Sequence, residues 1–136
     1  MCSFLSYEAV LSAVIEGSNL LASDSNGLSD PYVEIEFQSN KQKTSVRERT
    51  LRPIWGNGAG EKIRFGMKPL KKNEDWRVLF EVFDKDTLGR DFLGSAVINL
   101  RTVRQGDSIW LNLLKKGENQ DRSDNYEVVG KVRSTE

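Results

Sequence analysis

The chain has 136 residues, of which 38% are hydrophobic and 29% are charged, and these values fit one globular domain with a sizeable core. Its 20 lysines and arginines balance 20 aspartates and glutamates, so the zero formal net charge implies no general attraction to polyanions such as nucleic acids. The single cysteine excludes an intrachain disulfide and suits a reducing, cytoplasmic compartment, and no apolar run approaches the length of a membrane span.

The first predicted element is a β-strand over residues 7–16. Apolar residues fall on both of its faces, so its register stays open, and a short helix that ends before Gly17 is the alternative. We expect residues 1–6 to be an N-terminal extension, residues 7–133 to form the domain and residues 134–136 to be a C-terminal tail.

An acidic turn follows at residues 20–30, where Asp24 and Asp30 lie between apolar runs. The next segment, residues 31–38, alternates Tyr and Glu with Val, Ile and Phe, which is typical of a half-buried strand. Pro31 fits the first position of this strand, because a missing N–H is tolerated there.

Residues 41–52 carry five cations and one anion. Strand alternation is expected to place four of these cations on one outward face: Lys41, Lys43, Arg47 and Arg49. A row of this kind can hold anionic lipid headgroups. The alternative is a solvated strand whose charges resist pairing at the sheet edge.

Five further strands are predicted beyond a glycine-rich loop at residues 56–60: residues 62–65, 76–83, 92–100, 108–114 and 126–132. Polar connections separate them at residues 66–75 and 115–125, and residues 76–83 alternate most strongly. About eight short strands without a convincing helix predict an all-β fold, an antiparallel eight-stranded β-sandwich with Greek-key connections.

The sequence FDKDTLGRDFLG at residues 83–94 holds three carboxylates within eight positions: Asp84, Asp86 and Asp91. Carboxylates crowded in this way repel one another, so the loop gains little unless a cation fills it. Hard oxygen ligands in a flexible loop suit Ca²⁺, whereas zinc prefers Cys or His and the chain has no histidine. The alternative is a solvated hairpin loop, since Asp and Gly are ordinary turn residues.

Three motifs together resemble the C2 domain, a β-sandwich module that binds calcium and phospholipid. NLLASDSNGLSDPYVEI is similar to the family's first calcium loop, TLRPIWG to its T-x-x-P-x-W turn, and FDKDTLGRDFLG to its third calcium loop. The resemblance covers the chain from about Tyr7 to Val132 and implies the circularly permuted topology called type II. The chain departs from the pattern at residues 56–60, where glycines replace the acidic residue that many members carry after the tryptophan.

The resemblance implies a calcium site shared by two loops. Its ligands are the side chains of Asp24, Asp30, Asp84, Asp86 and Asp91 and the backbone carbonyls of Ser23 and Lys85. These carboxylates total about −5, and roughly two calcium ions reduce that to about −1, so the site stops repelling anionic lipid. Asp91 follows Asp84 by seven positions, one fewer than in many calcium-binding members, so it is expected to reach the second ion poorly.

Further residues are expected to contact lipid. Leu28 and Leu88 belong at the loop tips, where apolar side chains can enter the acyl boundary, and Arg90 can pair with a phosphate. In the family, the region of the basic row is used for phosphoinositides. For Leu28, Leu88 and Arg90 the alternative is packing within the loop.

Other functions fit less well. An EF-hand needs flanking helices and a Glu at the twelfth position, where this chain has Ser95. Catalytic motifs that would indicate an enzyme are missing, the carboxylates alone do not make a glycosidase, and the basic segment lacks the interleaved aromatics of a nucleic-acid site. We therefore expect a monomeric module of signalling or trafficking that binds phosphatidylserine or a phosphoinositide at the membrane when calcium is bound. The alternative is a calcium-independent C2-like scaffold for a protein partner.

Overall fold

The computed structural model describes residues 7–18, 20, 27–67, 77–102, 108–116 and 126–135. For residues 7–13, 66–67, 115–116 and 126–135 it describes only the backbone. Asp24 and Ser23, which were predicted to bind calcium, lie outside the described residues.

The described part of the chain forms eight β-strands and two single-turn 3-10 helices. The strands are β1 (Tyr7–Ser18), β2 (Pro31–Phe37), β3 (Asn40–Lys43), β4 (Glu61–Met67), β5 (Arg77–Asp86), β6 (Gly89–Asn99), β7 (Ser108–Lys116) and β8 (Tyr126–Thr135). The helices, η1 (Gly56–Gly58) and η2 (Leu100–Thr102), are far shorter than a membrane span, and no helix in the described residues has the length and apolar character to cross a bilayer. The all-β prediction is confirmed.

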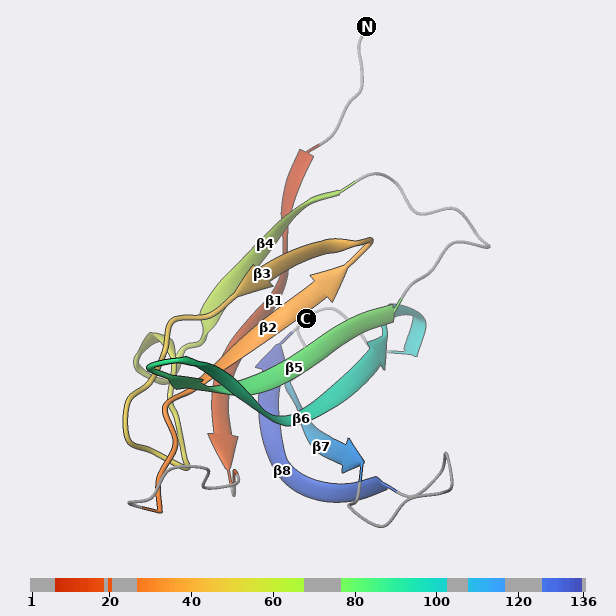
Figure 1. The fold of residues 1–136 in the computed structure, drawn as a ribbon. Helices are drawn as coiled ribbons and strands as arrows, with labels where there is room; N and C mark the ends of the chain where they lie inside the picture. Colours follow the sequence, from red (N-terminus) through yellow and green to blue (C-terminus); the bar gives the residue numbers. More distant parts are fainter. Residues whose placement is uncertain are drawn as a thin grey trace, which may run out of the picture.

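The strands form two antiparallel layers that continue into each other in the order β3-β2-β5-β6-β7-β8-β1-β4. Figure 1 shows the first layer, β3-β2-β5-β6, lying over the second, β7-β8-β1-β4. The two are joined at the β6–β7 edge by the pairing of Ser95 with Leu114. This is the predicted antiparallel sandwich, and the type II topology stays a prediction.

The core lies between the layers. In β2 the side chains of Val33, Ile35 and Phe37 point inward and are buried, as the alternation of residues 31–38 predicts. Phe37 meets Phe65 of β4 edge-on at a centroid distance of 6.1 Å, so this pair connects the two layers.

Trp55, the tryptophan of the T-x-x-P-x-W turn, is fully buried in this core. Its indole N–H donates to the backbone oxygen of Ser45 over 2.9 Å, which satisfies its one polar atom. The turn therefore fixes the segment after β3 against the sandwich. That segment leads to the pole of the domain where the tip of the β5–β6 hairpin lies.

Two local predictions are corrected. The first segment is a strand that continues to Ser18, so the helix alternative is wrong, and both Val14 and Ile15 are buried. The strand of the basic segment ends at Lys43, so strand alternation does not extend to Arg47 and Arg49. Instead, the chain bends away, and Arg49 has a positive φ of 52°.

Candidate functional site

The acidic sequence at residues 84–91 forms the tip of a tight β-hairpin, with Thr87 and Leu88 as its turn. Asp86 is paired with Gly89, and Asp84 is paired with Asp91 across β5 and β6. Side chains that are directly opposite in antiparallel strands share a face, and alternate residues along a strand do too. Asp84, Asp86 and Asp91 therefore lie on one face of the hairpin, which we call the acidic face.

The acidic face is joined to the end of the first acidic turn through Asp30. The backbone N–H of Asp30 donates to Oδ1 of Asp84 over 2.6 Å, and the N–H of Lys85 donates to the backbone oxygen of Asp30 over 3.0 Å. Asp84 itself is fully buried. Two segments that are 54 positions apart in the sequence thus meet at one pole of the sandwich.

At this pole the carboxylates of Asp30, Asp84 and Asp86 each accept a hydrogen bond from a backbone amide. Oδ1 of Asp30 accepts from the N–H of Arg49 over 2.7 Å. Oδ1 of Asp86 accepts from the N–H of Thr87 over 2.7 Å, which caps the turn locally. These contacts give the acids a structural role in addition to any role in metal binding.

The donor chemistry of this pole fits calcium, because its described residues offer carboxylate and carbonyl oxygens and include no histidine or cysteine. Among the residues that the structure describes, however, no three acidic side chains come close enough together to hold a metal ion. Asp84 and Asp91 are opposite each other, and Asp30 turns toward the segment after β3. A calcium site here therefore depends on the first loop, whose Asp24 and Ser23 are not described.

The two predicted lipid-contacting leucines differ in exposure. Leu88 is 99% exposed at the hairpin turn, so its whole side chain is available to an apolar phase. Leu28, at the end of the first acidic turn, is half-buried. The structure thus places one large apolar side chain at the extreme tip.

The opposite face of the hairpin is cationic and aromatic. Its centre is Arg90, whose guanidinium lies 3.8 Å from the centroid of the Phe83 ring. Nη1 of Arg90 donates to the hydroxyl of Tyr32 over 3.3 Å and to Oε2 of Glu34 over 2.5 Å. The hydrogen bond to Tyr32, and to a smaller extent the one to Glu34, raises the pKa of Arg90 above its usual value.

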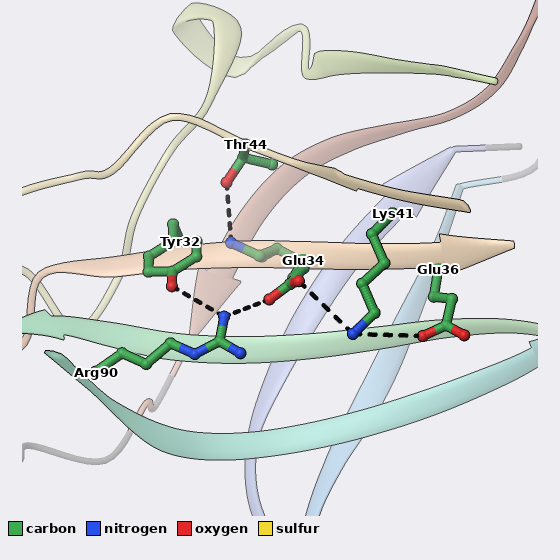
Figure 2. A network of polar contacts seen from close by, with 7 residues as sticks. Tyr32, Glu34, Glu36, Lys41, Thr44 and Arg90 are labelled. Atoms are coloured by element: carbon green, nitrogen blue, oxygen red, sulfur yellow. Dashed lines mark hydrogen bonds and ion pairs between the residues drawn. The ribbon is translucent and has the colours of Figure 1, made fainter. Parts of the chain in front are cut away.

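Glu34 also contacts the predicted basic row. Nζ of Lys41 lies 4.0 Å from Oε1 of Glu34 and 3.8 Å from Oε2 of Glu36. Figure 2 shows this network across the outer surface of the first layer, with Glu34 between Arg90 and Lys41. Arg90 and Lys41, which were predicted to contact lipid, are therefore paired with acids of their own sheet.

A groove of about 580 Å³ lies beside this network, between the hairpin and the end of β3. We call it the hairpin groove. Its lining residues are Tyr32, Lys43, Thr44, Ser45, Val46, Lys85, Gly89 and Arg90. Three of them are cations and none is acidic, so the groove has the charge that an anionic group requires.

The remaining cations of the predicted row lie elsewhere. Nε of Arg47 donates to the backbone oxygen of Ile54 over 2.9 Å, and neither Arg47 nor Arg49 lines the groove. Lys85 was predicted only as a calcium ligand through its backbone carbonyl. The structure shows that it also lines the hairpin groove.

Sequence reasoning also missed Glu34. The structure shows why: Gln38 and Ser39 form a two-residue turn, with positive φ at both positions, that pairs Glu34 with Lys43 and Glu36 with Lys41. Neither residue is a glycine, asparagine or aspartate, the types that mark such a turn in a sequence. Alternation from that pairing puts the acids of β2 and the lysines of β3 on one surface.

The family model of the C2 domain matches residues 10–113. Among curated proteins, the C2 domain-containing protein At1g53590 of Arabidopsis thaliana is 36% identical over 106 residues, which cover 76% of this chain and 13% of that protein. The eye isozyme of protein kinase C from Drosophila melanogaster is 32% identical over 96 residues, which cover 66% of this chain and 13% of that protein. The chain thus spans only a small part of the length of these relatives.

Solved structures share the fold. The C2A- and C2B-domains of Extended-Synaptotagmin 2 match with a TM-score of 0.66 at 23% identity, covering 98% of this chain and 43% of the other. A calcium-bound structure of the same two domains matches with a TM-score of 0.64 at 24% identity, covering 91% of this chain and 43% of the other.

Proposed function

Because the chain belongs to the C2 domain family, whose members are generally lipid- and membrane-binding modules, we propose that it binds anionic phospholipid in a calcium-dependent way, without enzymatic activity. The observation that carries the proposal is the contact between Asp30 and buried Asp84. It brings the ends of both acidic segments to one pole, beside the exposed Leu88.

The carboxylates of Asp24, Asp30, Asp84, Asp86 and Asp91, with the carbonyls of Ser23 and Lys85, are the proposed ligands. Calcium, when bound, supplies positive charge and open coordination positions for phosphate oxygens. The hydrogen bonds from Asp30 and Thr87 amides hold Asp84 and Asp86 in place, so the acids do not need to be ordered by the metal alone. We expect a peripheral membrane location on the cytoplasmic side.

The other residues of the pole support membrane contact in different ways. Leu88 can leave water for the acyl boundary at no cost in internal packing, because it is already 99% exposed. The groove cations, which are Lys85 and Arg90 of the hairpin and Lys43 of β3, can attract a phosphate. The proposed headgroups are therefore phosphatidylserine or a phosphoinositide.

The test uses the intact chain in two measurements. Isothermal titration should show heat with Ca²⁺ and little with Mg²⁺, and calcium at about 100 times its Kd should raise the free energy of unfolding by about 2.7 kcal/mol. Phosphatidylserine vesicles should sediment the protein with calcium and release it with a chelator. The Asp86→Asn variant should lose this response, and wild-type sedimentation by that variant would contradict the assignment.

A second candidate is a calcium-independent scaffold for a protein partner. It is favoured by the described carboxylates accepting backbone hydrogen bonds and by the lack of a three-acid cluster in the described residues. A flat calcium titration at millimolar ion, together with an unshifted melting temperature, would select it over the first proposal.

A further inference from the structure

The outer surface of the first layer carries cations and carboxylates in adjacent strands. Glu34 of β2 lies at the centre of this surface: it is paired with Lys43 of β3 on one side and with Glu81 of β5 on the other. Its carboxylate contacts Arg90 through Oε2 and Lys41 through Oε1. One acid thus engages two cations from two different strands.

The side chain of Glu34 is only 15% exposed, whereas those of Arg90 and Lys41 are 46% and 53% exposed. A largely covered carboxylate is costly to leave without a partner, so it holds its cations more firmly than a solvated acid does. Arg90 is further fixed by Tyr32 and by the ring of Phe83. The guanidinium of Arg90 is therefore held in a fixed position, and its charge is already paired with that of Glu34.

Arg90 is at the same time a wall residue of the hairpin groove, which has no acid in its lining. A phosphate in the groove that contacts Arg90 must share this guanidinium with Glu34 or displace the carboxylate from it. The carboxylate also lies within hydrogen-bond distance of that guanidinium, so its negative charge opposes an incoming anion at short range.

We propose that Glu34 is a built-in competitor for phosphate groups at the hairpin groove. It keeps the cationic surface weak in the absence of metal and so makes membrane binding depend on the acidic face of the hairpin. This inference rests on the proposed function for the membrane context, and it assigns to Glu34 the role of a selectivity-determining residue. The ligand class is a phosphate-bearing anion, either on a lipid headgroup or as a soluble inositol phosphate.

The experiment measures binding of the intact chain in chelator to three probes: phosphatidylserine vesicles, vesicles containing a phosphatidylinositol bisphosphate, and soluble inositol hexakisphosphate. The Glu34→Gln variant should bind more tightly by about fivefold or more, as expected for about one additional available cation near an anionic surface. A gain with vesicles alone indicates the headgroup in its bilayer, and a gain with all probes indicates the phosphate itself.

Glu81→Gln is the matched control. It removes the same charge from a residue directly opposite Glu34, but in the described part of the chain Glu81 has no ion pair with Arg90. Its gain should be clearly smaller. The double variant Glu34→Gln with Arg90→Gln should lose most of this gain, because Arg90 is the released cation that lines the groove, whereas Lys41 does not line it and still has Glu36 beside it.

Equal gains for Glu34→Gln and Glu81→Gln would overturn the inference, as would a gain that survives the loss of Arg90. If Glu34→Gln does not fold, Glu34→Thr gives the same test with a side chain that favours strands. A wild-type protein that does not bind vesicles with calcium would reject the proposed function alone, since the chelator measurements still decide the role of Glu34.

Discussion

The two faces of the β5–β6 hairpin carry opposite charge and differ in how that charge is held. On the acidic face, Asp84 is buried and accepts a backbone N–H, while Asp91 opposite it is exposed. On the other face, Arg90 is paired with Glu34 and stacked on Phe83. Asp84 is stabilised by a main-chain N–H, and Arg90 is stabilised by a side chain of another strand.

This difference indicates where a ligand can act. A cation at the acidic face can add to the amide hydrogen bonds that Asp84 and Asp86 already accept. An anion that contacts Arg90 at the other face must compete with Glu34. The two faces of one hairpin are therefore unequal as binding sites, although the sequence gives both the charge that a ligand needs.

The largest effect is expected at Asp84. The Asp84→Ala variant leaves the N–H of Asp30 without its acceptor, so the free energy of unfolding should fall by about 1–3 kcal/mol. Urea unfolding in chelator measures this without interference from metal. An unchanged midpoint would show that the contact between the two acidic segments does not stabilise the domain.

The next effect concerns membrane binding rather than stability. The Leu88→Ala variant should fold as the wild type does, because the side chain is 99% exposed. It should weaken binding to calcium-loaded phosphatidylserine vesicles by about 1–2 kcal/mol, which follows from the lost apolar area. Vesicle sedimentation over a lipid series gives the affinity, and wild-type affinity would place Leu88 outside the membrane contact.

Variants of the two lysines of β3 distinguish the contribution of the hairpin groove from that of the ion-paired surface. Lys43→Gln should weaken binding of vesicles with a phosphatidylinositol bisphosphate by about fivefold, since a cation near an anionic surface contributes about 1 kcal/mol. Lys41→Gln should have a smaller effect, because Lys41 is already close to Glu34 and Glu36. Equal losses would show that these ion pairs do not restrict Lys41.

The smallest effect has the opposite sign. Asp91 is directly opposite Asp84, and like charges in such pairs destabilise a hairpin. In chelator, Asp91→Asn should therefore raise the free energy of unfolding by about 0.2–1 kcal/mol. Saturating calcium should remove this gain if Asp91 is a ligand, and thermal melts with and without calcium measure both quantities.

Much of the fold follows from the sequence. The alternation of residues 31–38 predicted which side of β2 faces the core, and Val33, Ile35 and Phe37 are buried there. The motif that ends in Trp55 predicted a turn, and the tryptophan is buried. Local periodicity is sufficient for β2 because burial of one face of a strand depends on that strand's own residues.

The sequence also identified the acidic segments, and the resemblance to the family predicted that they act together. It did not determine the partners of Arg90 and Lys41, because those depend on which strands are neighbours in the sheet. Glu34 lies 56 positions before Arg90, and only the placement of the β5–β6 hairpin beside β2 brings them into contact. The sequence determines which charged residues the protein has. Whether one of these charges is available to a ligand depends on the tertiary structure, because an ion pair such as that of Glu34 and Arg90 needs a short distance between residues that are remote in the chain.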